Sequence, residues 1–134
     1  MSIAENKRIA GQFIEALADL SGTSCMALMS DSGTFAWMLR SRSLPLGTQV
    51  TKEEFGEVVR SMRSAFPNGV RHEIRDMLAE GDGVAIETES FAVMSDGRLY
   101  NNVYHFRMTI RGGKVECVKE YTDFLYAKEL VFGG

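Results

Sequence analysis

The glutamate Glu120 is the residue whose type and position most directly suggest chemistry. It lies in the run VKEYTD, residues 118–123, near the end of a segment with the pattern of a packed β-strand. Alternate side chains of a strand point to the same face, so Glu120 shares a face with Val118. If that face is the interior, loss of hydration raises the carboxyl pKa toward that of a working general base. The alternative is a structural acid that bonds a buried tyrosine, an arginine or the backbone.

A second strand-like segment offers groups that could hold a substrate oxygen. In residues 98–111 the side chains of Tyr104 and Phe106 belong to an apolar set that alternates with polar residues, and Asn102 lies on the same face. The Tyr104 hydroxyl and the Asn102 amide are therefore candidates to orient a substrate. Otherwise Tyr104 is a core residue with a satisfied hydroxyl, and Asn102 bonds its local backbone.

The other reactive side chains give weaker signals. His105 lies on the outward set of its strand, and we predict a surface or interface position for it and likewise for His72. The two histidines lack metal-ligand spacing, so we predict no metal, and nothing in the sequence indicates another cofactor. Cys25 and Cys117 are too few for a disulfide framework, and we expect reduced, buried thiols.

Composition limits the class of protein. The chain has 134 residues, of which 45% are hydrophobic, which suits one domain over residues 1–134 with a real core. The net charge of −3 comes from interleaved acids and bases, so nucleic-acid binding has little support. No apolar run reaches the roughly 18 residues of a membrane helix, and the first residues lack the apolar core of a signal peptide. We therefore expect no membrane partner and a cytoplasmic location.

The first half of the chain has helical periodicity. Ser2 and Glu5 have capping-box spacing before an apolar stripe, and Thr51 and Glu54 repeat that signal before a second stripe. The sequence after the second stripe, PNG, ends that helix. Between the two helices we predict a short helix at 24–30 and a strand at 33–39.

From Val70 onward the hydrophobic period changes from near 3.6 to 2. Short glycine-bearing breaks separate the segments, which favours hairpins and an antiparallel meander. Helices followed by such a sheet indicate an α+β fold, and three N-terminal helices on one face of a curved sheet would leave a cone-shaped apolar cavity. The strands are expected at 70–79, 83–94, 98–111 and 114–124, with a last helical turn at 125–132.

The order of elements and three stretches resemble the SnoaL-like and ketosteroid-isomerase-like branch of the nuclear-transport-factor-2-like superfamily. The stretches are NKRIAGQFIEALADL at the start, GDGVAIETE in the middle and YNNVYHFRMTIRGGKVECVKEYTD at the end. The resemblance covers nearly the whole chain. It implies a cone-shaped α+β barrel, a hydrophobic small-molecule ligand and a homodimer formed through the outer sheet face. It leaves the activity open, because this fold hosts isomerases, cyclases, epoxide hydrolases and non-enzymatic binders.

Two families can be compared with this chain through their functional positions. The three positions of ketosteroid isomerases fall on Phe13, Trp37 and close to Phe106, and none of these residues carries the required group. In SnoaL-type polyketide cyclases one acid of the last strand is the base of an aldol step, and Glu120 matches that position with glutamate in place of aspartate. That chemistry needs a base near an acidic C–H and a cavity that folds the substrate.

Limonene epoxide hydrolase gives a poorer match. Its arginine and first acid would fall near Thr88 and Ser90, and its tyrosine and asparagine near Phe35 and Trp37. Only the final acid is matched, by Glu120. The water-activating set of that enzyme is therefore absent from this sequence.

Two functions remain open at this point. The first is a homodimer that binds a hydrophobic carbonyl compound and transfers a proton in an isomerase-, cyclase- or hydrolase-like way, with Glu120 as base and Tyr104 or Asn102 on a substrate oxygen. The alternative is a non-catalytic ligand-binding or interaction domain in which Glu120 is an ion pair. The residues predicted to line the pocket are Phe13, Phe35, Trp37, Thr88, Asn102, Phe106 and Val118.

Overall fold

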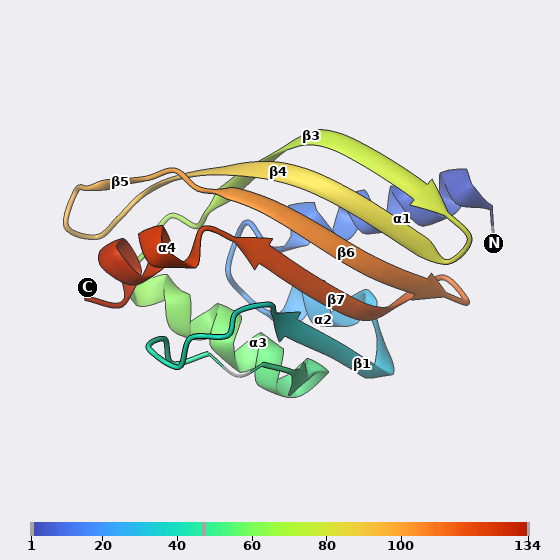
Figure 1. The fold of residues 1–134 in the computed structure, drawn as a ribbon, viewed down its shortest axis with the longest axis horizontal. Coiled ribbons are helices and arrows are strands. Elements are labelled where there is room, and N and C mark those ends of the chain that lie inside the picture. Colours follow the sequence, from blue (N-terminus) through green and yellow to red (C-terminus); the bar gives the residue numbers. More distant parts are fainter. Residues whose placement is uncertain (1, 47, 134) are drawn as a thin grey trace.

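A computed structural model describes residues 2–46 and 48–133, and Figure 1 shows its fold. In this part of the chain four α-helices accompany a sheet of seven strands. The helices are α1 (Ile3–Ala16), α2 (Thr23–Ala27), α3 (Lys52–Ser61) and α4 (Phe124–Val131), with a 3-10 turn, η1 (Met62–Ser64). The strands are β1 (Met29–Trp37), β2 (Val50–Thr51), β3 (Arg71–Glu80), β4 (Gly83–Val93), β5 (Leu99–Tyr100), β6 (Val103–Arg111) and β7 (Lys114–Thr122).

Helices α1 and α3 begin at the predicted caps. The Ser2 side chain accepts a hydrogen bond from the Glu5 amide at 3.1 Å, which is a one-sided cap. Thr51 and Glu54 form the full capping box, with the Thr51 hydroxyl accepting at 3.2 Å and the Glu54 carboxylate accepting at 2.9 Å. Each satisfied cap stabilises its helix by about 1 kcal/mol.

Helix α2 is shorter than predicted, because the following residues are drawn into the sheet. Met29 pairs with Val115 of β7, and the Val115 amide donates to the Leu28 carbonyl at 2.9 Å. The first strand therefore starts at Met29 and not at residue 33. The predicted strand at 98–111 is also divided, into β5 and β6, with Asn101 and Asn102 between them.

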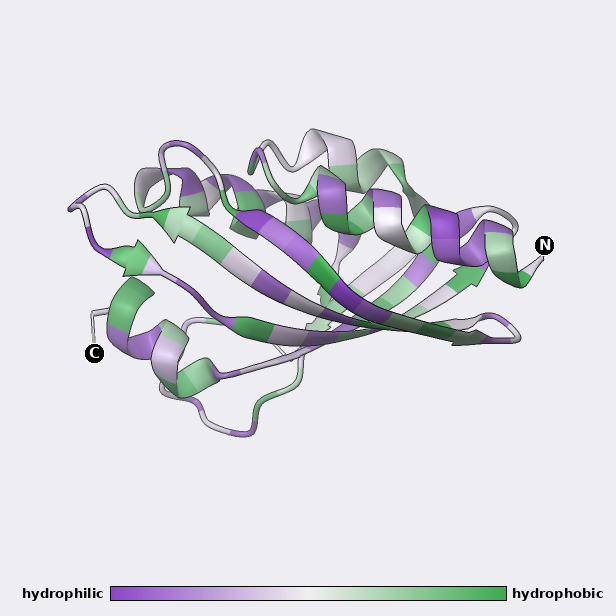
Figure 2. Ribbon diagram, turned by 90° about the horizontal axis from the view of Figure 1, so that it is seen from above, coloured by the Kyte–Doolittle hydropathy of each residue, from purple (hydrophilic) through white to green (hydrophobic). Residues whose placement is uncertain are grey.

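The sheet has the order β2-β1-β7-β6-β4-β3, with β5 paired to β4. Strands β3, β4, β6 and β7 form the predicted antiparallel meander, whereas β1 joins β7 in parallel. The sheet curls strongly into a half-barrel (Figure 1). Along the strands hydrophobic and hydrophilic residues alternate, as the colours of Figure 2 show. The predicted α+β cone fold is confirmed.

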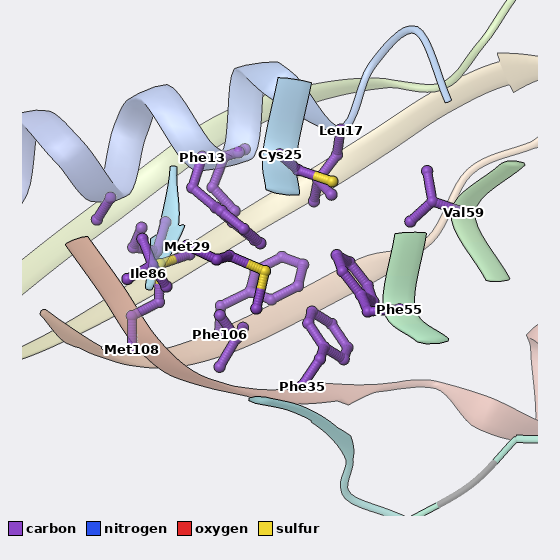
Figure 3. Packing of buried hydrophobic residues seen from close by; sticks show 14 of the residues in the cluster. Phe13, Leu17, Cys25, Met29, Phe35, Phe55, Val59, Ile86, Phe106 and Met108 are labelled. Carbon is purple, nitrogen blue, oxygen red and sulfur yellow. The ribbon is translucent and has the colours of Figure 1, made fainter. Parts of the chain in front are cut away.

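The core lies between the helices and the concave side of the sheet (Figure 3). Helix α1 contacts β3, and α3 contacts β1. The rings of Phe35 and Phe55 stack at 4.0 Å between centroids, and Phe13 stacks on Phe55 at 6.2 Å. These contacts join β1, α3 and α1 into one apolar layer. None of the described helices has the length and apolar character to cross a membrane.

Candidate functional site

A cavity of about 350 Å³ lies between α3 and the curved sheet. One end is bounded by Pro45 and Leu46 of the loop after β1, and by Phe124, Ala127 and Val131 of α4. The walls are mainly aromatic and aliphatic. The aromatic lining residues are Phe35, Trp37, Phe55, Phe66, Tyr100, Tyr104, Phe106, Phe124 and Phe132.

The polar groups of the cavity wall are few. Among the described lining residues the ionisable side chains are His72, Tyr100, Tyr104 and Glu120, and no lysine or arginine is included. A pocket with apolar walls and a small set of polar groups is typical of a small-molecule site. An anionic group in such a wall would be buried without a cation to pair with, which costs free energy.

Glu120 lies in β7 between its register partners Trp37 of β1 and Phe106 of β6. Its side chain shares the inward face with Val118, which is fully buried, as the alternation predicted. Neither a hydrogen bond nor an ion pair holds its carboxylate among the described residues of the chain. Burial without a partner raises the pKa of Glu120 to about 8.

A pair of tyrosine hydroxyls lies in the same cavity. The hydroxyls of Tyr100 and Tyr104 are 3.1 Å apart. The Asn102 amide donates to the Tyr100 oxygen at 2.9 Å, and the Ser90 hydroxyl donates to the Tyr104 oxygen at 3.2 Å. The bond between the two tyrosines uses one phenolic proton, so the other remains available to a ligand. Burial raises the pKa of both tyrosines, and the charge of Glu120 raises both further.

Asn102 supports this pair from behind and does not line the cavity. It is 3% exposed, and its amide nitrogen also donates to the Asp123 carbonyl at 3.2 Å. Tyr100, which does line the cavity, was not among the predicted site residues. Tyr100 is four residues before Tyr104 in the predicted strand 98–111, so strict alternation places both side chains on the same face and would have identified Tyr100 as a candidate lining residue.

The prediction of a surface position for His72 is wrong. The ring lines the cavity, and its Nδ1 lies 3.0 Å from the Thr88 hydroxyl. Burial lowers the pKa of His72 to about 4. A bulge between Ile74 and Asp76 shifts the register of β3, so His72 shares the inward face with Met77 and Ala79, which the unbroken alternation of a regular strand does not allow.

The other predicted pocket residues divide into two sets. Phe35, Trp37 and Phe106 line the cavity together with Tyr104 and Glu120. The remaining four, Asn102 among them, are not lining residues and lie behind the wall. Phe13 stacks against Phe55, Thr88 bonds His72, and Val118 is part of the core.

The helices and the curled sheet thus enclose an aromatic cavity that holds one carboxylate among the described lining residues, which is the architecture of an α+β cone. A family model, the SnoaL-like domain, matches residues 10–118, so the chain belongs to the SnoaL-like family. No curated protein matches the sequence significantly.

Solved structures share the fold at low sequence identity. AusH from Aspergillus nidulans is 19% identical, with a TM-score of 0.80 and with 91% of this chain and 86% of that chain covered. An NTF2-like protein from Burkholderia pseudomallei is 12% identical, with a TM-score of 0.80 and 98% of both chains covered. An LEH-like epoxide hydrolase from M. tuberculosis is 16% identical, with a TM-score of 0.75 and with 98% of this chain and 92% of that chain covered. At such identities the likeness defines the fold alone.

Proposed function

We propose that the protein binds an uncharged, hydrophobic carbonyl compound and transfers a proton on it, with Glu120 as the base. The observation that carries this proposal is a carboxylate without a partner among the described residues, in an aromatic cavity that also contains the Tyr100–Tyr104 hydroxyl pair. One solved structure with the same fold is an LEH-like epoxide hydrolase.

The pKa of Glu120 suits the task of a base. A general base works best when its pKa is close to the operating pH, because it is then both available and strong. With a pKa of about 8, roughly one-tenth of the carboxyl groups are ionised at pH 7. The rate of a reaction that needs the ionised form should therefore rise with pH and level off above pH 8.

The tyrosine pair supplies the complementary group. Removal of a proton beside a carbonyl moves negative charge onto the oxygen, where a positioned donor stabilises it. The free phenolic proton of the pair is such a donor. Since Asn102 and Ser90 both donate into the pair, its geometry is set before a ligand arrives.

Hydrogen exchange on a probe ketone tests the proposal. 2-Tetralone in D₂O would be followed by ¹H NMR for loss of the hydrogens beside its carbonyl, with wild type, Glu120→Gln and Glu116→Gln. Glu116 lies on the same strand but bonds the hydroxyls of Ser30 and Ser32 and does not line the cavity, so its variant is the matched control. We expect Glu120→Gln to lower the protein-dependent exchange by about 100-fold or more, while Glu116→Gln retains it. Exchange that survives in Glu120→Gln would exclude Glu120 as the base.

A non-catalytic binder is the second candidate. The observation that favours it is that Glu120 is the one carboxylate among the described lining residues and is mostly protonated at neutral pH. In that case wild type does not accelerate exchange. Glu120→Gln, which imitates the protonated acid, then binds the same ketone with unchanged affinity.

We also propose that two copies associate through the outer face of the sheet. Leu78, Val103 and Tyr121, on β3, β6 and β7, point away from the core and are 67%, 59% and 43% exposed. Glu87 and Arg107 lie on the same outer face. A surface with both apolar groups and charges of both signs can match a two-fold copy of itself.

A further inference from the structure

We propose that His72 serves the cavity as a neutral hydrogen-bond donor through Nε2–H, and that it selects ligands with an acceptor oxygen at that point. This deepens the proposed function, since it rests on the cavity taking a small molecule, but it does not require Glu120 to act as a base.

The first step is the contact between His72 and Thr88. The Thr88 side chain is 2% exposed, so its hydroxyl proton must be donated within the protein. The one side-chain hydrogen-bond partner of this hydroxyl among the described residues is His72 Nδ1, at 3.0 Å. If the hydroxyl donates to the ring, Nδ1 carries no proton and accepts. A neutral imidazole then has its single proton on Nε2.

The second step is the charge of the ring. The Tyr104 ring lies 4.8 Å from the His72 ring between centroids, and the Phe106 ring lies at 6.1 Å. No acid is ion-paired with His72 in the described parts of the chain, and the nearest acid along β3, Glu73, pairs with Arg71 and Arg75 on the exposed side. Burial among aromatic rings lowers the pKa of His72 to about 4, so the ring stays neutral at physiological pH.

The third step is the unused nitrogen. Nε2 has no protein partner among the described residues, although the ring forms part of the cavity wall. The fully buried side-chain polar atoms that lack a partner in the described structure are Asn6 Oδ1 and Ser21 Oγ. Nε2 of His72 is not among them, so this nitrogen is accessible. An accessible donor in an apolar cavity regains a hydrogen bond when a ligand presents an acceptor.

With this arrangement His72 discriminates between ligands by whether they carry an acceptor oxygen. A neutral N–H favours carbonyl, ether or hydroxyl oxygens and gives no such bond to an apolar group or to an ammonium group. An unpaired buried donor costs about 1–3 kcal/mol, which corresponds to a preference of roughly 5- to 150-fold. The tyrosine pair offers a donor in the same cavity, so the preferred ligand has two acceptor oxygens.

The tautomer can be measured directly in the free protein. Two-bond ¹H–¹⁵N NMR spectra of wild type across pH 5 to 8 would be compared with those of His72→Gln, which identifies the His72 signals. We expect a ring with its proton on Nε2 and no titration in this range. A proton on Nδ1, or titration near pH 6.5, would overturn the assignment whatever Glu120 does.

A pair of matched probes tests the selection. Calorimetry would compare 2,6-diacetylnaphthalene, which has an acceptor oxygen for each of the two donors, with 2,6-diisopropenylnaphthalene, which has the same shape but no acceptor oxygen. We expect His72→Leu to weaken binding of the ketone about 10-fold and leave the hydrocarbon unchanged, and His72→Gln, with an amide donor at a similar position, to restore part of the loss. Equal weakening of both probes would assign His72 to packing. If Glu120→Gln loses the exchange while His72→Leu binds the ketone as tightly as wild type, Glu120 is the base and the proposed role of His72 is overturned.

Discussion

Single residues of the cavity reduce the stability of the fold. Glu120 has a pKa of about 8 in the folded protein, against an ordinary value of 4.5. The folded state therefore holds a proton that the unfolded chain releases between these two pH values. The unfolding free energy should fall as the pH rises from 4.5 to 8 and then level off, with a total loss of about 5 kcal/mol.

Glu120→Gln removes this dependence. We expect the variant and wild type to have similar unfolding free energies near pH 4, and the variant to become the more stable protein as the pH approaches 8, because it buries no charge. Urea denaturation at several pH values measures the difference. If the difference in unfolding free energy between Glu120→Gln and wild type does not change with pH, the carboxylate has a partner in the folded protein.

His72 acts in the opposite direction. Its pKa is about 4 in the folded protein and 6.5 ordinarily, so below pH 6.5 the unfolded chain takes up a proton that the folded protein excludes. Relative to His72→Gln, wild type should lose roughly 3 kcal/mol as the pH falls from 6.5 to 4, and nothing above pH 7. Urea denaturation over the same pH range measures this loss. If the unfolding free energies of wild type and His72→Gln change with pH in the same way, His72 is not held as a neutral ring in the folded protein.

At the scale of elements, the junction between α1 and β3 determines where His72 lies. The Val70 amide donates to the Ala18 carbonyl at 2.9 Å and ties the start of β3 to the end of the first helix. Gly69 precedes this bond with φ of +81°, and a Cβ there would overlap the Ala18 carbonyl oxygen. The turn therefore needs glycine both for its backbone angle and for the close approach.

Gly69→Ala should destabilise the protein more than Gly97→Ala. Gly97 has a similar φ of +88° but open space around the position of a Cβ, so its variant isolates the backbone penalty of about 1–2 kcal/mol. Overlap at Gly69 should add about 1–3 kcal/mol. Thermal unfolding of both variants compares them, and equal losses would mean that the junction yields without strain.

Elements with local signals were predicted well. The caps at Ser2 and Thr51 and the glycine turns of the meander depend on neighbours in sequence, and the helices and hairpins occur where these signals are. Features that depend on pairing with strands distant in the sequence were not predicted. The early start of β1 at Met29 and the bulge of β3 after Ile74 are products of strand pairing, which no local pattern contains.

At the scale of the whole molecule, the outer sheet face gives a test of association. We expect wild type to scatter light as twice its 14.9 kDa chain mass and Val103→Glu to shift toward the monomer, because the new charge would be buried in the interface. Leu125→Glu is the control, since Leu125 is 65% exposed on α4 and not on the sheet. A monomeric wild type would contradict the proposal.

The sequence by itself determined the α+β class, the helix caps, the alternation of the strands and the inward face of Glu120, because each depends on residues a few positions apart. The tertiary structure alone decided that the carboxylate has no partner among the described residues, that Tyr100 and Tyr104 bond each other, and that His72 faces the cavity. These facts depend on which strands become neighbours and on where a bulge shifts their register. The neighbours of Glu120 and His72 are residues far apart in the chain, and the orientation of Tyr100 toward Tyr104 depends on the break between β5 and β6, which a one-dimensional pattern does not record.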